Sequence, residues 1–272
     1  MHDFLYQRPT QLPEASQWAK EHVDYKLLAG GMSLIPSLKM RLSQPAGLID
    51  LSAIDALKGV RLEGDELIIK AMTPHAEVAI DKNVRQGIRA LCELAAGIGD
   101  PLVRNRGTIG GSLANADPAA CYPSAVLALN ATIKTNQREI AADQFFLGLF
   151  ETALQPGEII TEIRFPKPKA AAYWKFRQPA SRFSLVGVFV AQTTTGVRVA
   201  ITGAADTVFR HTEAEQRLNV QFHPSALKGL FMSEKNMNSD IHASAQYRAH
   251  CIDVITERAV AMALNLPPQK ES

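Results

Sequence analysis

Residues 104–129 read RNRGTIGGSLANADPAACYPSAVLAL, the stretch of the chain with the most unusual composition. Its first half is small, polar and glycine-rich, with the pair Gly-Gly at the centre of residues 108–112. Its second half predicts a helix of small residues that begins near Pro118 or Pro123. A second Gly-Gly pair, in the segment AGGMS at residues 29–33, follows a short apolar stretch. Each pair is flanked by hydroxyl-bearing residues.

The two glycine pairs are candidate anion-binding loops. Glycine has no Cβ, so backbone N–H groups can converge on a ligand and approach it closely. Several such N–H groups with a Ser or Thr hydroxyl form a cradle suited to a phosphate, and two cradles suit a diphosphate. Neither pair matches the GxGxxG dinucleotide motif or the GxxxxGK[ST] phosphate loop. From the residues alone, a nucleotide-like cofactor in a cleft between two sub-lobes and a pair of ordinary turns are equally open.

The composition is that of an ordinary globular protein. The chain has 272 residues, of which 46% are hydrophobic and 21% charged, enough for one large domain or two modest ones. Its 29 Lys and Arg against 27 Asp and Glu leave a formal charge of +2, which argues against nucleic-acid binding. Cys92, Cys121 and Cys251 form no CxxC pair, so neither a disulfide framework nor an iron–sulfur or zinc site is expected in this chain.

No segment has the pattern of a secretion signal or a membrane span. The first ten residues, MHDFLYQRPT, lack a cationic segment followed by an apolar one. The longest charge-free stretches, 118–133 and 183–197, are shorter than the roughly 20 apolar residues that a membrane helix needs. We therefore expect a cytoplasmic protein without membrane insertion.

The hydrophobic pattern predicts mixed helices and strands, with a linker at FPKPKA around Pro166–Pro168. Strands followed by helices predict an α+β carboxy-terminal domain, and PPQKES is expected to fray. The predicted helical stretches are 12–26, 73–97, a short one holding Phe145 and Phe146, and most of 213–266. The predicted strands are 48–52, 66–72 after a hairpin turn, parts of 133–142 and 158–166, 172–178, 185–193 and 196–205.

The two glycine segments together resemble a known family. Residues 29–42, AGGMSLIPSLKMRL, resemble the first FAD-binding motif of the flavoprotein (medium) subunit of molybdenum hydroxylases, AGG-x-S-L-hydrophobic-P. Residues 104–129 resemble its second motif, R-x-x-x-TIGG-small-L-A-x-A-x-P-A-x-D-x-P. Medium subunits of carbon monoxide dehydrogenase and the flavin domains of xanthine dehydrogenase and aldehyde oxidase belong to this family, and the resemblance covers essentially the whole chain.

The resemblance implies an α+β fold. Residues 1–168 would form a two-lobed FAD-binding domain of the PCMH/vanillyl-alcohol-oxidase-like type, with the lobes meeting near residues 55–60. Residues 169–272 would form the smaller α+β carboxy-terminal domain of the carbon monoxide dehydrogenase flavoprotein type. The implied cofactor is FAD, with no metal ligand and no catalytic acid or base in this chain.

The resemblance also assigns cofactor-binding residues. Ile98 would pack near the flavin, Ile160 near the adenine, and Lys175 would place a cation near the isoalloxazine, where it favours electron density on the reduced ring. The remaining implied positions are Leu28, Ala29, Gly30, Gly31, Met32, Ser33, Leu34, Thr108, Ile109, Gly110, Gly111, Ser112, Asn115, Asp117 and Cys121.

Two of these positions depart from the family pattern. Met32 replaces the polar residue often found there, so contacts at that point are expected from the backbone alone. Cys121 stands where the family usually has an Asp that takes a cofactor hydrogen bond, and a thiol is a poor substitute. That contact is expected to be missing, weakened or supplied by Asp117.

The function implied is electron transfer within a larger complex. A large molybdopterin-binding subunit would oxidise the substrate, an iron–sulfur subunit with [2Fe–2S] clusters would relay electrons, and this chain's FAD would pass them to an acceptor, in a dimer of heterotrimers. One alternative is a stand-alone flavin oxidase of the vanillyl-alcohol type, for which no sufficiently long substrate domain remains. The other is a structural subunit that has lost its flavin, as the departure at Cys121 allows.

Overall fold

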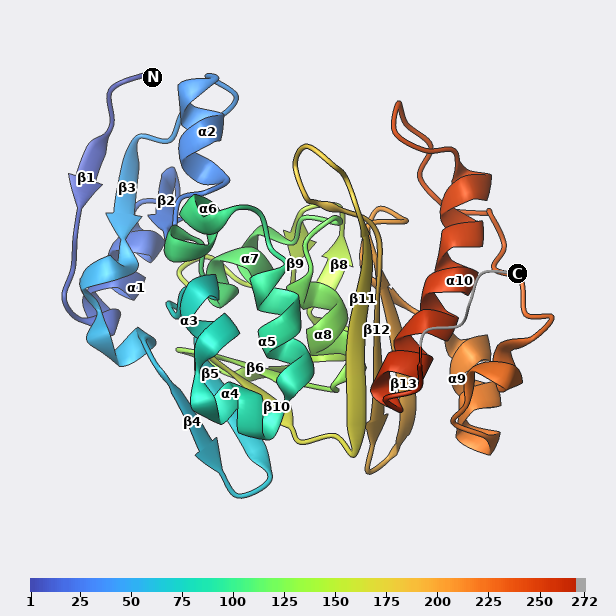
Figure 1. Ribbon diagram of the computed structural model, residues 1–272. Helices are drawn as coiled ribbons and strands as arrows, with labels where there is room; N and C mark the ends of the chain where they lie inside the picture. The colour runs from blue at the N-terminus through green and yellow to red at the C-terminus, as the bar shows by residue number, and fades with distance from the viewer. Residues whose placement is uncertain (268–272) are drawn as a thin grey trace.

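The computed structural model describes residues 1–267, so the expected fraying of the last residues falls at 268–272, outside the described part, apart from Pro267. The layers follow one another nearly in sequence order, from the N-terminal lobe at the left of Figure 1 to the C-terminal helices at the right. The mixture of sheets and helices is α+β, as the sequence predicted.

The N-terminal lobe is a parallel three-stranded sheet in the order β1-β3-β2. The predicted helix over 12–26 ends earlier, because residues from Tyr25 onward pair with the neighbouring strand. Two 3₁₀ turns, Leu51–Ala53 and Asp55–Leu57, lead out of the lobe. Its elements are β1 (Leu5–Gln7), α1 (Leu12–Glu21), β2 (Tyr25–Leu28), α2 (Leu34–Lys39) and β3 (Gly47–Asp50).

An antiparallel five-stranded sheet, in the order β4-β5-β10-β6-β7, forms the second lobe. The helical periodicity over 73–97 becomes three short helices, because Asp81 accepts the N–H groups of Asn83 and Val84 and so caps a new helix. The strands are β4 (Val60–Glu63), β5 (Glu66–Lys70), β6 (Thr132–Thr135), β7 (Glu139–Ala141) and β10 (Ile160–Pro166). The helices are α3 (His75–Ile80), α4 (Lys82–Gly87), α5 (Arg89–Ala96), α6 (Pro101–Arg106), α7 (Ile109–Asn115) and α8 (Tyr122–Ala128).

The segment around Phe145 and Phe146 differs from the prediction. A 3₁₀ turn spans Ala142–Gln144, and Phe146 then begins a small hairpin of β8 (Phe146–Gly148) and β9 (Glu151–Thr152). Phe145 is fully buried in the core and Phe146 packs against the same cluster. The two aromatic residues therefore fix this segment to the core and do not form one face of a helix.

The C-terminal part is an antiparallel sheet, β11-β12-β13-β14, with helices on its outer face (Figure 1). Residues 228–244, predicted as part of a helical stretch, contain no helix or strand. Ser244 then caps the last helix by accepting the N–H of Tyr247 at 3.2 Å. The elements are β11 (Ala170–Arg177), β12 (Ser184–Thr193), β13 (Gly196–Thr202), β14 (Phe209–Arg210), α9 (Thr212–Val220), a 3₁₀ turn at Pro224–Leu227 and α10 (Ala245–Ala263).

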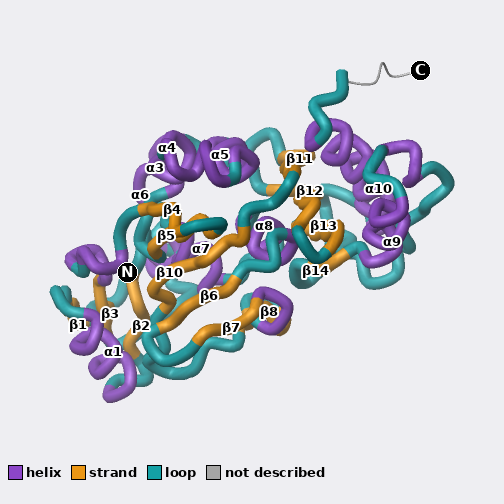
Figure 2. The backbone as a smooth tube through the Cα atoms, turned by 90° about the horizontal axis from the view of Figure 1, so that it is seen from below, coloured by secondary structure: helices purple, strands orange, loops and turns teal. Residues whose placement is uncertain are grey.

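One apolar core joins the second lobe to the C-terminal sheet. Helix α8 lies between the two sheets (Figure 2), and Tyr122 of α8, Phe165 of β10 and Phe189 of β12 are all fully buried in the same cluster. A second core lies between the C-terminal sheet and α10, where Val188 and Ile252 are buried. Side chains this completely removed from water supply most of the stabilisation of the fold.

The other face of the five-stranded sheet is polar and centred on Glu162. Its carboxylate is buried beneath cations, with Lys70 Nζ at 2.7 Å, Arg164 Nη2 at 2.9 Å and Arg61 Nη1 at 3.3 Å. Burial alone would raise the pKa of Glu162, but the hydrogen bonds from Lys70 and Arg164 and the charges of Lys70 and Arg61 lower it from 4.5 to about 2. Glu162 is therefore charged in the folded protein at every pH above that value.

Replacing Glu162 by Gln should remove a pH-dependent part of the stability. A depressed carboxyl pKa stabilises the folded state fully above the unfolded pKa of about 4.5, and this contribution is lost as the pH falls towards 2. Because the partner cations are partly exposed, we expect about 1–2 kcal/mol. Urea unfolding at pH 7, 4 and 3 should show the wild type and Glu162→Gln converging at low pH, and a difference that stays constant would contradict this account.

Candidate functional site

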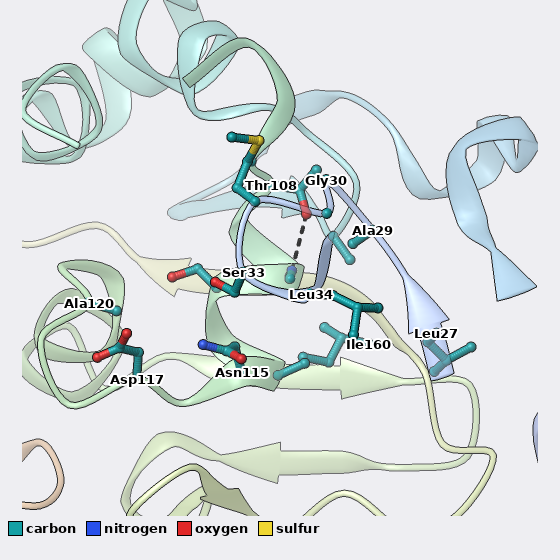
Figure 3. Close-up of a pocket in the computed structure, with 18 of the residues that line it drawn as sticks. Leu27, Ala29, Gly30, Ser33, Leu34, Thr108, Asn115, Asp117, Ala120 and Ile160 are labelled. Carbon is teal, nitrogen blue, oxygen red and sulfur yellow. Dashed lines mark hydrogen bonds between the residues drawn. The ribbon is translucent and has the colours of Figure 1, made fainter. Parts of the chain in front are cut away.

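A cavity of about 750 Å³ lies where the N-terminal lobe meets α7, β10 and the C-terminal sheet. Figure 3 shows Leu27 and Ile160 at one end of it, and Asp117 and Ala120 at the other. The structure brings nearly all the predicted site residues to its wall. These are Ala29, Gly30, Gly31, Met32, Ser33, Leu34, Ile98, Thr108, Gly110, Gly111, Ser112, Asn115, Asp117, Cys121, Ile160 and Lys175.

The first glycine loop offers a row of free donors. The backbone N–H groups of residues 30–34 donate to no protein acceptor among residues 1–267, and all five residues line the cavity. Gly31 has φ +74°, which only glycine adopts without strain, and this turns the chain from β2 into α2. Consecutive N–H groups without a protein acceptor, in a loop that lines a cavity, fit the oxygens of a diphosphate.

The second glycine loop does not offer the N–H cradle that the sequence predicted. The N–H of Ile109 donates to Thr73 O at 3.2 Å, that of Gly110 to Ala71 O at 2.8 Å, and that of Gly111 to Thr108 Oγ1 at 3.1 Å, drawn as the dashed line in Figure 3. These bonds fix the start of α7 to the end of β5. What this segment presents to the cavity is instead the side chains of Ser112, Asn115 and Asp117.

The glycines are required by contacts within the protein. A Cβ on Gly30 would overlap Arg106 O and lie 2.7 Å from Gly107 Cα, and one on Gly110 would lie 2.6 Å from Ala71 Cβ. A Cβ on Gly111 would lie 3.1 Å from Ala29 Cβ, in the first loop. The sequence predicts these glycines for close approach of a ligand, which stays a prediction, and within the protein they allow close packing between the two loops and against Ala71, which follows β5.

Lys175 reaches the cavity from the C-terminal sheet. Its Nζ donates to Gly97 O at 2.8 Å and to Arg182 O at 2.9 Å, and it lies 3.3 Å from Cys121 Sγ. Cys121 is buried, with its sulfur 3.6 Å from Ser184 Oγ. The thiol is therefore a direct neighbour of the lysine ammonium. A carboxylate at this position would form an ion pair with it.

Further cations hold the backbone next to Lys175. Arg104 Nη1 donates to Ile98 O at 2.9 Å and to Gly99 O at 3.0 Å, and Arg182 Nη1 reaches Gly99 O at 3.3 Å. With Lys175 on Gly97, three cationic side chains bind three successive carbonyl groups. This end of the cavity is electropositive, and the segment that carries Ile98 is held from both parts of the chain.

Two titratable groups in the wall are shifted towards their neutral forms. Burial raises the pKa of Asp117, although the Ala119 N–H, 2.8 Å from its Oδ1, acts in the opposite direction. Burial, and then the charge of Arg104, lower the pKa of His75 to about 4. His75 is thus a neutral imidazole at neutral pH, and its Nδ1 has no hydrogen-bond partner among the described residues.

Some wall residues were not predicted, and two predicted residues lie elsewhere. Leu28 is outside the wall, and Ile109 is fully buried in the core of the second lobe. Residues such as Tyr25, Leu27 and His75 line the cavity without a sequence signal, because distant segments bring them together. The same is true of Glu158 and Arg182.

Two other kinds of feature, a metal cluster and a membrane-spanning helix, are absent from the described part of the chain. No cluster of three or more His, Cys, Asp or Glu side chains that could hold a metal ion occurs in residues 1–267. Among the helices described, none is both long and apolar enough to cross a membrane.

Comparisons of the sequence and the structure with known proteins show what this chain is similar to. Residues 2–168 match the family model described as the FAD-binding domain in molybdopterin dehydrogenase. The chain is 34% identical to the 6-hydroxypseudooxynicotine dehydrogenase complex subunit alpha of Paenarthrobacter nicotinovorans, over 92% of this chain and 90% of that one. It is 36% identical to the carbon monoxide dehydrogenase medium chain of Hydrogenophaga pseudoflava, over 79% of both. A structure of reconstituted carbon monoxide dehydrogenase from Oligotropha carboxidovorans superposes with a TM-score of 0.91 at 30% identity, covering 98% of this chain and 99% of that chain.

Gly110→Ala should destabilise the protein even in the absence of any ligand. The added Cβ would lie 2.6 Å from Ala71 Cβ, and overpacking of this kind costs about 1–3 kcal/mol. Thermal unfolding of the ligand-free protein measures this. Gly148→Ala is the matched control, because its Cβ would meet only the flexible end of Glu151 at 3.3 Å. If Gly110→Ala unfolds at the wild-type temperature and only ligand binding is lost, the glycine serves the ligand after all.

Proposed function

This chain belongs to the family of FAD-binding domains in molybdopterin dehydrogenases, and we propose that it transfers electrons from [2Fe–2S] clusters of a partner subunit to an external acceptor. It is the FAD-binding medium subunit of an oxidoreductase of the molybdenum hydroxylase type. The observation that carries the proposal is the row of five N–H groups at residues 30–34 that have no acceptor among residues 1–267, in a loop that lines a cavity with cations at one end.

The residues of the cavity fit FAD in three zones. The N–H groups of the first loop would bind the diphosphate, with Ser112, Asn115 and Asp117 as polar neighbours. Ile160 would contact the adenine, and Ile98 would pack against the flavin ring. When bound, FAD supplies a carrier that takes up two electrons and releases them to an acceptor. The protein's own work is to bind it, orient it and tune it electrostatically.

Lys175 is the residue that would tune the ring. Its ammonium lies at the electropositive end, held by the carbonyl groups of Gly97 and Arg182, so its position is fixed before any ligand arrives. A fixed cation beside a ring that gains electron density on reduction favours the reduced state, because the charge needs no rearrangement to act. Arg104 and Arg182 add positive charge beside it, and the neutral His75 adds none.

We propose that the partners are an iron–sulfur subunit and a large molybdopterin-binding subunit, assembled as a dimer of heterotrimers. Support comes from the names of the relatives, which are a subunit of a dehydrogenase complex and a medium chain. A further support is that Cys92, Cys121 and Cys251 are free and buried, so an iron–sulfur relay would be brought by another chain. The cytoplasmic location stays a prediction.

We also propose the division into an FAD-binding domain, residues 1–168 with lobes meeting near 55–60, and a carboxy-terminal domain, residues 169–272. Strand β10 ends at Pro166 and β11 begins at Ala170, so the proposed boundary falls between two sheets. Lys175 and residues 181–183 nevertheless reach back to the cavity wall, so the site would draw on both domains.

The complex purified from its own cells should contain this chain, an iron–sulfur protein and a molybdopterin protein, with one FAD per copy of this chain. The FAD should be released by acid, because His75 and Cys121, the His and Cys side chains in the wall among the described residues, are buried. Native mass spectrometry and the flavin spectrum measure composition and stoichiometry.

The isolated chain should bind FAD yet oxidise neither aldehydes, purines nor carbon monoxide. Substrate oxidation by the pure single chain, or a native complex made only of copies of it, would contradict the proposed function. A chain that folds but takes up no FAD would support the flavin-free alternative.

Lys175→Gln should lower the midpoint potential of the bound flavin, because it removes the cation that favours reduction. A loss of about 1.4 kcal/mol corresponds to about 30 mV for a two-electron couple. Redox titration of the FAD-loaded protein measures the shift. Lys235→Gln, at an exposed position outside the cavity wall, is the control and should leave the potential unchanged. An unchanged potential in Lys175→Gln would exclude the tuning role.

A further inference from the structure

The end of the cavity remote from Lys175 is closed by a turn between β9 and β10. Leu154, Gln155, Pro156 and Gly157 of this turn line the wall. The N-terminal lobe contributes Ala19, Val23, Tyr25 and Leu27 to the same wall, from α1, β2 and the segment between them. These residues are apolar or aromatic, so this end of the cavity suits a flat heteroaromatic group.

An ion pair between the buried carboxylate of Glu158 and the half-exposed guanidinium of Arg138 holds this turn. The Glu158 carboxylate, 3% exposed, accepts Arg138 Nε at 2.9 Å and Nη2 at 3.1 Å, Thr135 Oγ1 at 2.8 Å and the Gln155 N–H at 2.8 Å. Arg138 Nη2 also donates to Ala153 O at 2.6 Å. The pair therefore fixes the turn at both ends, to the connection between β6 and β7.

A second set of hydrogen bonds ties the turn to helix α1. Ser16 Oγ, on α1, donates to Gly157 O at 2.8 Å and accepts Asn136 Nδ2 at 2.7 Å. Asn136 Oδ1 accepts the Ile159 N–H at 2.8 Å. The turn is therefore bound to the N-terminal lobe as well as to the connection between β6 and β7.

Arg138 acts on the cavity through the turn, by its bonds to Glu158 and to Ala153 O. Arg138 and Thr135 are not part of the wall, whereas the turn that they hold is. Without the pair, the turn loses the bonds at Gln155 N–H, Thr135 Oγ1 and Ala153 O and keeps those at Gly157 O and Ala153 N–H. A ligand would then have to bear part of the cost of ordering the turn. If the wall has its binding conformation only part of the time, the apparent dissociation constant of the ligand rises by the inverse of that fraction. A wall that is ordered in advance therefore binds the ligand more tightly.

We propose that the Arg138–Glu158 pair is a positioning element that shapes the adenine end of the cavity and makes this chain select FAD over flavins that lack the adenylate half. The inference rests on the proposed function, because it takes FAD as the ligand. It adds to that function the residues that set the selectivity, at the opposite end from the redox-active ring.

Glu158→Gln and Arg138→Gln should lower the affinity for FAD while sparing FMN. If the turn is correctly formed about a tenth of the time in the variants, FAD binds about tenfold more weakly. ADP, which occupies only the adenine and diphosphate positions, should lose the same factor, and FMN should change by less than about twofold. Calorimetric titration of the flavin-free protein with FAD, ADP and FMN measures all three.

Controls separate positioning from general loss of structure. Glu213→Gln, which breaks an exposed pair with Arg217 on α9, should leave all three affinities unchanged. Arg138, with a side chain 46% exposed, gives a variant that tests the proposal even if Glu158→Gln unfolds. Equal losses for FAD and FMN, or a lowered melting temperature with unchanged FAD affinity, would overturn the proposal. Failure of the wild type to bind FAD would instead overturn the proposed function.

Discussion

The two glycine loops pack backbone against backbone, and the rest of the site depends on this contact. Gly30 sits against Arg106 and Gly107 at a distance that leaves no room for a Cβ, and the His75 N–H donates to Gly107 O at 2.9 Å. The contact sets the N-terminal lobe against the second lobe, and the cavity is the space left beside it. Any side chain at Gly30 would push the lobes apart and change every distance across the cavity.

The two loops then take different electrostatic roles. The second loop uses its N–H groups on the carbonyl groups of β5 and so becomes rigid, whereas the first keeps its N–H groups free for a ligand. Three fixed cations, Lys175, Arg104 and Arg182, lie at one end of the cavity, where they bind the carbonyl groups of residues 97–99. The cavity therefore offers backbone dipoles in the middle and full positive charge at one end, both in place before binding.

The sequence predicted what depends on local pattern and missed what depends on distant contacts. The resemblance to the family is confirmed, as are the α+β class and FAD as the cofactor. The helix ending at Glu21 and the strand at Phe146 were missed, because sheet pairing and core packing override local periodicity there. The meeting of Lys175 with Gly97, 78 positions apart, and of Asn136 with Ser16, 120 apart, left no trace in either segment. The sequence pattern located the glycines, but the contacts in the folded chain were needed to explain why a side chain is excluded there.

The shared core limits how parts of the chain can be exchanged. Tyr173, Phe189 and Ala200, beyond the end of the family match at residue 168, pack in the same apolar cluster as Leu67 and Phe165 before it. The boundary drawn on the sequence therefore separates residues that share one apolar cluster. A chimera that joined residues 1–168 to the C-terminal part of a distant relative would have to rebuild this interior from two unmatched surfaces. Cavities or overpacking there would destabilise the fold, so the two parts can be exchanged only where their buried side chains complement each other.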